Sequence, residues 1–497
     1  MSTTAQIQEP DVLAGPDVAS RVVRGGVART VGFVVVNLLG VAGSVVLLRY
    51  LGVAEYGRYG TVLALVAIVT GLSDAGLTIT GARELSLLPR GAQRRRLLGA
   101  ILGGRLLLST LAVLGAVAFA AIAGYDHVLV LGTVLAGMGA ILVGAQAAMT
   151  TPLVVELRNG LLTVSEIVRQ VILFVGIVAL VAVGASLAPF FAVQIAVGAG
   201  GLLIVPFLVH RSYLTRPTLS REDWRRLAVT AFPVAVASVL TVLYVRLLVV
   251  FSSLLTSAYQ TGLFVTSARI TEMLGGLALL LSGVILPVAT VAARDDRGRL
   301  RYVLVHTTKV SLLVGGLLSL VVAVAAHPIV VLLGGHAFAP AASVVRLQAP
   351  MVLTIFLVYP WTSFLIADGR RRDLVRCMLT GLVLVTVTGL ILISQLEARG
   401  AALAAVGADA ALAVTIVLAV RRVGDGTWPV PRSFLWRYAL VLALGAGAGV
   451  ATLSAAPAVA AGAVAALVFV AGALVLRIVP EELTTLVPLA ARLAARD

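Results

Sequence analysis

Long apolar stretches separated by short polar breaks dominate the chain. Fourteen of them are long enough to cross a bilayer as helices, which takes about 20 apolar residues each. They cover residues 28–49, 60–82, 97–123, 127–149, 160–184, 187–209, 227–250, 261–291, 308–333, 342–367, 374–395, 400–420, 434–454 and 457–477. The pattern predicts an all-α polytopic membrane protein with about 14 transmembrane helices.

Composition supports this interpretation and excludes a large soluble domain. Hydrophobic residues make up 60% of the 497 residues and charged residues 12%, whereas soluble proteins carry about 25% charged residues. The single cysteine, Cys377, cannot close an internal disulfide, and the only lysine, Lys309, does not fit a phosphate-binding P-loop. We therefore expect no cofactor, no metal site and no nucleic-acid partner.

The basic residues gather in alternate loops. Loops on one side of the predicted membrane carry 30 of the 38 basic residues, and loops on the other side carry 3. Cytoplasmic loops are enriched in arginine and lysine, so the richer side is the cytoplasmic one. The pattern predicts a multi-pass protein of the cytoplasmic membrane with both termini in the cytoplasm.

An internal repeat predicts two pseudo-symmetric lobes. Ala54-Glu55-Tyr56-Gly57-Arg58-Tyr59 follows the first stretch, and Ala258-Tyr259-Gln260-Thr261-Gly262-Leu263-Phe264 follows the seventh. An offset of six spans is what two parallel six-helix lobes produce. The predicted parts are a cytoplasmic tail (1–27), a first lobe (28–210), a cytoplasmic linker (211–226), a second lobe (227–421), two extra C-terminal helices (434–477) and a cytoplasmic tail (478–497).

Two polar connections predict helices lying along the membrane surface. In the linker, Ser220 and Asp223 resemble a capping box that opens a short helix carrying Trp224. After Pro480, the tail spaces its leucines among polar residues in a similar way. Both segments are interpreted as anchors.

Charged residues inside the predicted spans are the candidate functional residues. They are Arg105, Arg169, Arg246, Arg269 and Arg346, with Asp74, Glu166, Glu272 and Asp409. A charge at bilayer depth costs about 3 kcal/mol or more, so each is expected to face the bundle interior and find a partner or water.

Their positions in the spans leave several alternatives open. Arg269 lies about ten residues along its span, deeper than Arg246 and Arg346, but Glu272 is three residues further on, so the two form either a substrate site or a structural pair. The same alternatives hold for Glu166 and Arg169. Arg246 and Arg346 lie close enough to the outer edge to snorkel. Asp74 has no basic residue nearby in its span. It is therefore either a proton or cation site or a residue hydrogen-bonded to the backbone.

The excess of arginine over acidic residues in the spans favours a substrate that carries phosphate or pyrophosphate. Arg269, Glu272, Arg105, Arg169, Arg246 and Arg346 are the candidate substrate-binding residues, and Asp74 and Asp409 are the candidates for ion coupling. No carboxylate pair has the spacing of acid and base catalysis, and the outward loops are too short for a catalytic domain. We expect a protein that is not an enzyme and has no catalytic residues.

Short motifs along almost the whole chain resemble the polysaccharide flippases, the Wzx-like translocases of lipid-linked oligosaccharides. The motifs are Leu48-Arg49-Tyr50-Leu51-Gly52, Glu55-Tyr56-Gly57-Arg58-Tyr59-Gly60, Ser73-Asp74-Ala75-Gly76-Leu77, Ala82-Arg83-Glu84-Leu85, Gly262-Leu263-Phe264 through Ala268-Arg269, Leu286-Pro287, Leu333-Gly334-Gly335 with Ala341-Ala342, and Gly400-Ala401-Ala402-Leu403. These motifs are short, and their order along the spans carries the resemblance.

The resemblance implies a transporter of the multidrug, oligosaccharidyl-lipid and polysaccharide (MOP) exporter superfamily. Such a protein moves an undecaprenyl-pyrophosphate-linked oligosaccharide through a central cavity that opens alternately to each side, and Arg269 is the best match to a cavity residue. Its partners would be the lipid bilayer and glycosyltransferases or a polymerase of the same pathway, and we expect a monomer.

Two other functions stay open. One is a cation-coupled multidrug-type antiporter of the same superfamily, which would require Asp74 or Asp409. The other is a non-transport membrane subunit of a polysaccharide synthesis complex.

Overall fold

The computed structural model describes residues 18–74, 76–89, 91–156, 158–210, 213–218, 220–422 and 430–479, and its regular elements are helices throughout these ranges. The helices are α1 (Val18–Asp74), α2 (Leu77–Leu87), α3 (Ala92–Ile122), α4 (His127–Met149), α5 (Thr151–Val155), α6 (Asn159–Ala182), α7 (Leu187–Leu208), α8 (Arg221–Leu255), α9 (Ala258–Asp295), α10 (Arg297–Val324), α11 (Ala326–Gly334), the 3-10 turn η2 (His336–Phe338), α12 (Ala341–Gln348), α13 (Pro350–Ala367), α14 (Arg371–Arg421), α15 (Arg432–Leu453) and α16 (Ala458–Val475).

Twelve helices in the described ranges are long and apolar enough to cross a membrane. The prediction of an all-helical multi-pass protein is therefore confirmed, whereas the predicted count of fourteen spans is not. The difference arises at two places. The first two predicted spans form one continuous candidate, Val31–Leu87, and the eleventh and twelfth form another, Arg371–Arg421.

The two longest helices, α1 and α14, are each interrupted by one residue with a non-helical backbone. In α1 this residue is Gly52, at φ 71° and ψ 177°. A glycine adopts this conformation readily because it has no Cβ. In α14 the corresponding residue is Glu397, at φ 51° and ψ −127°. A side chain at positive φ is strained, so the break in α14 is held at a cost in conformational energy.

Glycine at position 397 is expected to stabilise the protein. Replacing Glu397 with glycine removes the Cβ that makes its backbone conformation unfavourable, which is worth about 1 kcal/mol. The measurement is the apparent melting temperature of the purified protein in detergent. Glu397→Ala is the matched control, because it removes the carboxylate but keeps the Cβ. Equal stabilisation by alanine would show that the charge, not the backbone, is responsible.

The chain divides into two compact units whose bounds differ from those of the predicted lobes. The first unit holds Met1–Gly43, Leu72–Gly115 and Val134–Ala235. The second holds Ser44–Gly71, Ala116–Thr133 and Val236–Asp497. Residues 44–71 and 116–133 of the predicted first lobe thus belong to the second unit. The two lobes stay a prediction.

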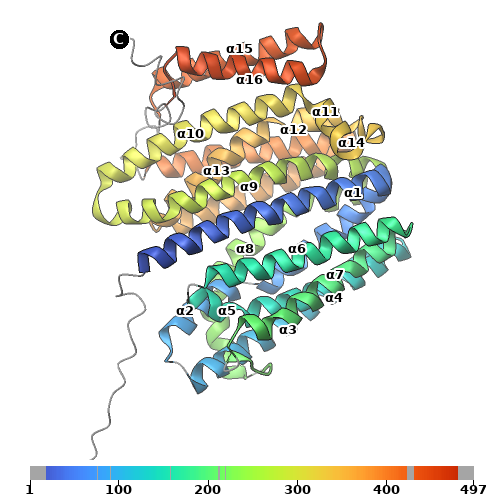
Figure 1. Cartoon of the computed structure of the whole chain (residues 1–497), viewed down its shortest axis with the longest axis vertical. Coiled ribbons are helices and arrows are strands. Elements are labelled where there is room, and N and C mark those ends of the chain that lie inside the picture. Colours follow the sequence, from blue (N-terminus) through green and yellow to red (C-terminus); the bar gives the residue numbers. More distant parts are fainter. Residues whose placement is uncertain are drawn as a thin grey trace, which may run out of the picture. The chain divides into compact units, whose positions relative to one another are not determined.

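In the first unit, α6 and α7 pack side by side, and α2 packs on α5 (Figure 1). Leu85, Leu153 and Val205 are fully or almost fully buried in its core. The predicted surface helix around Trp224 is not a separate element, because α8 begins at Arg221 and continues to Leu255. A Cβ on Gly104 of α3 would overlap the Trp224 ring, so the indole packs directly on that glycine.

In the second unit, α13 lies among α9, α10 and α14 and carries much of the core. Phe364 and Leu365 of α13 and Ile416 of α14 are fully buried there. The helices α15 and α16, which correspond to the two extra C-terminal spans, lie side by side (Figure 1). The predicted surface helix after Pro480 lies outside the described residues.

Two predicted spans of the second unit are each built from two helices. The stretch 308–333 is divided between α10 and α11 at Ala325. The stretch 342–367 is divided between α12 and α13, where Pro350 occupies the first turn of α13. Proline is favoured at that position because its missing N–H would be unpaired in any case.

Candidate functional site

Three charged side chains of the second unit form one cluster, which we call the charged trio: Arg246 of α8 with Arg269 and Glu272 of α9. Arg246 Nη1 donates to Glu272 Oε1 at 2.6 Å. Arg269 Nη1 lies 3.5 Å from Glu272 Oε2, so each carboxylate oxygen faces a different guanidinium. The pair of Arg269 and Glu272 expected from their spacing is present. The participation of Arg246, which the sequence placed near the outer edge, was not predicted.

The hairpin of α8 and α9 explains why Arg246 joins the pair. The two helices follow one another through the turn at Thr256 and Ser257, so residues at similar distances from this turn are level with one another. Arg246 precedes the turn by about as many residues as Arg269 follows it. Side chains at these levels can therefore meet, although they are far apart in the sequence.

The charged trio is polar, only partly covered by protein and positive. Its side chains are 32%, 36% and 30% exposed for Arg246, Arg269 and Glu272. Two guanidinium groups share one carboxylate, which leaves a formal charge of +1. Arg269 Nε also donates to Ser44 Oγ of α1 at 3.1 Å, which fixes the plane of its guanidinium. The cluster can hold an anion through planar, charge-assisted hydrogen bonds.

A buried carboxylate, Asp409 of α14, forms a second polar site in the second unit. It is 3% exposed. Tyr244 of α8 donates from its hydroxyl to Asp409 Oδ1 at 3.1 Å, and Thr354 of α13 donates from Oγ1 to Asp409 Oδ2. In the described part of the chain, the recorded partners of this carboxylate are these two hydroxyls. Hydroxyl bonds satisfy its oxygens without neutralising its charge.

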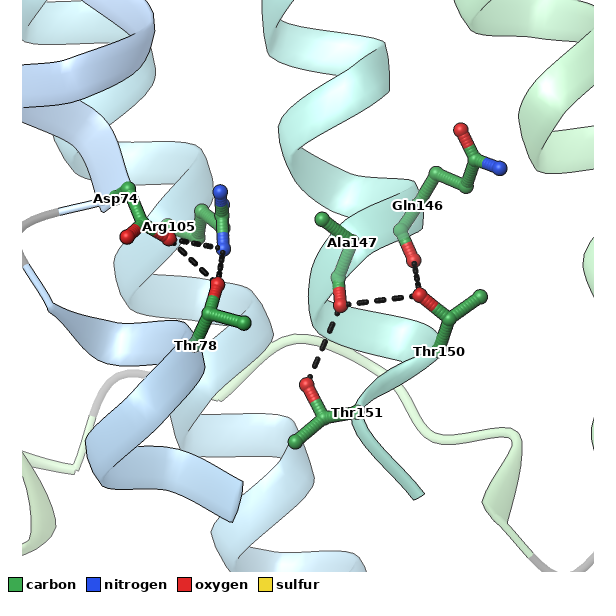
Figure 2. Close-up of polar contacts among 7 residues, drawn as sticks. All are labelled: Asp74, Thr78, Arg105, Gln146, Ala147, Thr150 and Thr151. Carbon is green, nitrogen blue, oxygen red and sulfur yellow. Dashed lines mark hydrogen bonds and ion pairs between the residues drawn. The ribbon is translucent and has the colours of Figure 1, made fainter. Parts of the chain in front are cut away.

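In the first unit, Asp74 and Arg105 form an ion pair (Figure 2). Arg105 Nη1 of α3 lies 2.8 Å from Asp74 Oδ1 and donates to Thr78 Oγ1 at 2.7 Å. Thr78 in turn donates from Oγ1 to the same oxygen of Asp74 at 2.5 Å. The basic partner that the span of Asp74 lacks therefore comes from a neighbouring helix, and the pair is neutral. Ion coupling by Asp74 stays a prediction.

The Asp74 pair spans a break between two helices. Helix α1 ends at Asp74, and α2 begins at Leu77, so the bond from Thr78 to Asp74 joins the first turn of α2 to the end of α1, and Arg105 ties both to α3. A nearby break, from α4 to α5, is bridged differently: the hydroxyls of Thr150 and Thr151 both donate to the carbonyl of Ala147 (Figure 2). Free carbonyls at helix ends need such donors inside a membrane protein.

The other two predicted arginines have different contacts. Arg169 of α6 is partly buried, and its aliphatic chain lies beside Gly201 of α7. Gln146 of α4 touches the same glycine and donates to Ser165 Oγ. Arg346 of α12 is exposed, and its Nε donates to the carbonyl of Ala323 at 3.3 Å. Substrate binding by either arginine stays a prediction.

The hydroxyl partners of both carboxylates were not predicted from the sequence. Thr78 could have been found, because it lies one helical turn after Asp74. Tyr244 and Thr354 gave no such signal, since they are separated from Asp409 by 165 and 55 positions. In the described ranges, no group of three or more His, Cys, Asp or Glu could hold a metal ion.

Comparison with known proteins gives one family match. The sequence model of a family described as polysaccharide biosynthesis protein matches residues 22–292, more than half of the chain. No curated protein matches the chain in sequence.

Several solved structures are similar in fold. The lipid II flippase MurJ, in an inward closed conformation, is 12% identical with a TM-score of 0.76, and the match covers 90% of this chain and 98% of MurJ. An inward-facing MATE-family multidrug resistance transporter of the MOP superfamily is 13% identical with a TM-score of 0.62, over 80% of this chain and 98% of that one. An outward-facing MATE transporter is 15% identical with a TM-score of 0.56, over 85% and 99%.

Proposed function

Because the chain belongs to the polysaccharide biosynthesis protein family, we propose that it flips a lipid-linked oligosaccharide across the cytoplasmic membrane for cell-envelope polysaccharide synthesis. The family and the fold are those of membrane transporters of the MOP superfamily, not of an enzyme. The family resemblance expected from the sequence is confirmed. The proposed cargo is a polyprenyl-pyrophosphate-linked oligosaccharide, and the proposed mechanism is alternating access.

The proposal includes fourteen membrane crossings. Helix α1 has 57 residues and α14 has 51. If either helix were straight, its length would be more than twice the thickness of a bilayer core, which is roughly 30 Å. The breaks at Gly52 and Glu397 divide each into two arms of spanning length. In α14 the arms fold back on one another, because a Cβ on Gly400 would lie 1.9 Å from the carbonyl oxygen of Leu392. In this proposal each long helix supplies two crossings, and both termini of the protein lie in the cytoplasm.

The charged trio supports a phosphate-bearing cargo. Its formal charge of +1 and its partial exposure suit a pyrophosphate group better than a cationic compound. In the proposed mechanism, Arg269 and Arg246 attract the pyrophosphate while Glu272 holds the two guanidinium groups in place. The lipid tail stays in the bilayer, so only the polar headgroup has to pass through the protein.

Asp409 supports coupling to a cation. A buried carboxylate whose partners are hydroxyls is costly as an isolated anion, so it gains stability from a proton or a bound cation. Asp74 is a weaker candidate, because Arg105 already compensates its charge. Coupling at Asp409 would let an ion gradient drive the flipping step, and glycosyltransferases or a polymerase of the pathway would supply and use the cargo.

The test of this function uses purified protein in liposomes with a fluorescent polyprenyl-pyrophosphate oligosaccharide. We expect protein-dependent movement of the label from the inner to the outer leaflet, and a loss of about tenfold in rate with Arg269→Ala, equivalent to about 1.4 kcal/mol of binding or barrier energy. The matched control is Arg376→Ala on α14, whose side chain is 78% exposed and far from the trio in sequence.

The possible results separate the alternatives. An unchanged rate in Arg269→Ala would return Arg269 to a structural pair with Glu272 and leave the function intact. No movement of the lipid, together with gradient-driven export of a small cation, would favour the antiporter.

A further inference from the structure

An apolar cavity lies in the second unit between helices α10 and α11 on one side and α16 on the other. Its volume is about 610 Å³, within the range of ligand-binding pockets in proteins. Val321, Ala325, Ile329 and Leu332 line one wall, and Ala463 belongs to the wall on α16. All the side chains that line the cavity are apolar, so the ligand it fits is a hydrocarbon chain and not a sugar or an ion.

A helix break and a row of small residues leave room for this cavity. Helix α10 ends at Val324 and α11 begins at Ala326, so the apolar stretch is interrupted at Ala325. Opposite this break, a Cβ on Gly462 of α16 would lie 3.1 Å from the Cβ of Ala325. The two helices are therefore close at Gly462, and the small side chains of Ala463 and Ala466 leave space beside that contact.

The cavity has the depth of one leaflet of a bilayer. On α16 it extends from Val459, next to the start of the helix, to Ala466, about two helical turns or roughly 10 Å further on. The hydrocarbon layer of one leaflet is roughly 15 Å thick, half of the bilayer core. The positive-inside pattern places the start of α16 outside the cytoplasm, so the cavity belongs to the leaflet on that side.

An arginine lies at the shallow end of the cavity. Arg49 of α1 is exposed, and its Nη2 donates to the carbonyl of Leu332 at 2.7 Å. Leu332 lines the cavity two residues before the end of α11, so this guanidinium is on the side nearer the membrane surface. The carbonyl of Leu332 is the recorded partner of Arg49 among the described residues, which leaves further N–H groups for a phosphate.

We propose that this cavity binds a membrane phospholipid, with one acyl chain along the apolar walls and the phosphate at Arg49. The site has the polarity of a phospholipid, whose charged group lies at the membrane surface with its chains below. A polyprenyl chain is much longer than one leaflet is thick, whereas an acyl chain matches it, so the ligand is a resident lipid and not the cargo. The inference goes beyond the proposed transport function and needs none of its steps.

The first test fills the cavity. Dioleoylphosphatidylglycerol is titrated onto the purified, delipidated protein in detergent, and binding of the first lipid is measured by native mass spectrometry. We expect Ala463→Phe to weaken this binding about tenfold, because the ring takes the place of the acyl chain. The matched control is Gly447→Phe on α15, at an exposed position where a Cβ meets nothing within 4 Å. Equal binding by the two variants would overturn the site.

The second test separates the phosphate from the chain. We expect Arg49→Gln to weaken binding of phosphatidylglycerol about fivefold and to leave unchanged the binding of dioleoylglycerol, which has the same chains but no phosphate. The matched control is Arg399→Gln on α14, an exposed arginine on the same predicted side of the membrane. An equal loss with both lipids, or with both variants, would overturn the phosphate site.

A competition experiment separates the resident lipid from the cargo. An equimolar amount of polyprenyl phosphate should leave the phospholipid bound to the unmodified protein. Its displacement would assign the cavity to the chain of the cargo and overturn the proposal of a resident phospholipid. All three measurements are made without transport, so a failure of the flipping assay leaves their results unaffected.

Discussion

Replacing Asp74 with asparagine is expected to lower the free energy of unfolding by about 3 kcal/mol or more, which is more than a hundredfold in the folding equilibrium. The side chain of Arg105 is only 6% exposed, so loss of the Asp74 charge leaves a buried guanidinium without compensation. The hydroxyl of Thr78 then remains as its hydrogen-bond partner but supplies no charge. The measurement is unfolding of the purified protein in detergent, followed by denaturant or temperature.

The reverse replacement should cost less. In Arg105→Met the remaining group is Asp74, whose side chain is 27% exposed and which keeps its bond from Thr78. The double variant Asp74→Asn with Arg105→Met serves as the control for coupling, because removing both charges leaves none unpaired. If the double variant loses as much stability as the two single variants added together, the two residues do not interact and this account is wrong.

The second large effect is expected at Asp409. Asparagine has the same shape and can still accept a bond from Tyr244 or Thr354, but it cannot take up a proton or hold a cation. We expect Asp409→Asn to abolish stimulation of flipping by an ion gradient, while the protein remains folded. The measurement compares flipping rates in liposomes with a proton gradient, with a sodium gradient and with neither.

Two controls make this result specific. Thr354→Val removes one hydroxyl donor but leaves the carboxylate, so it should weaken the stimulation without abolishing it. The melting temperature of each variant in detergent shows whether a loss reflects unfolding. Full stimulation in Asp409→Asn would make Asp409 a structural residue and exclude it as the coupling site.

The fold was largely predictable because hydropathy is a local property. The stretch 127–149 coincides with α4, and 187–209 differs from α7 by one residue, since polar turns define both ends of these helices. The sequence interpretation was wrong where a break falls inside a long apolar stretch. Helices α10 and α11 are separated at Ala325, just before His327 and Pro328, but the residues on both sides are apolar enough that hydropathy reads them as a single span.

For the candidate site, the sequence predicted which charged residues belong to the spans but not which of them pair. Depth along a span indicates that a charge needs a partner, and it marked Arg269 and Asp409 as residues to examine. It cannot indicate which helix supplies that partner. Arg246 is close enough to the outer edge to snorkel, but it lies against Glu272, and Asp74, which has no basic residue nearby in its span, pairs with Arg105 across 31 positions.

The sequence by itself determined that the chain is a helical membrane protein, where most of its apolar helices lie, and which charges those helices carry. These features follow from the cost of exposing backbone polar groups to lipid. Each helix satisfies its own backbone groups, so each apolar segment can be recognised by itself. The tertiary structure alone decided which charges neutralise each other and which hydroxyls bind Asp409. Those outcomes depend on the rotation and closeness of neighbouring helices, which are set by packing between segments that are distant in the sequence.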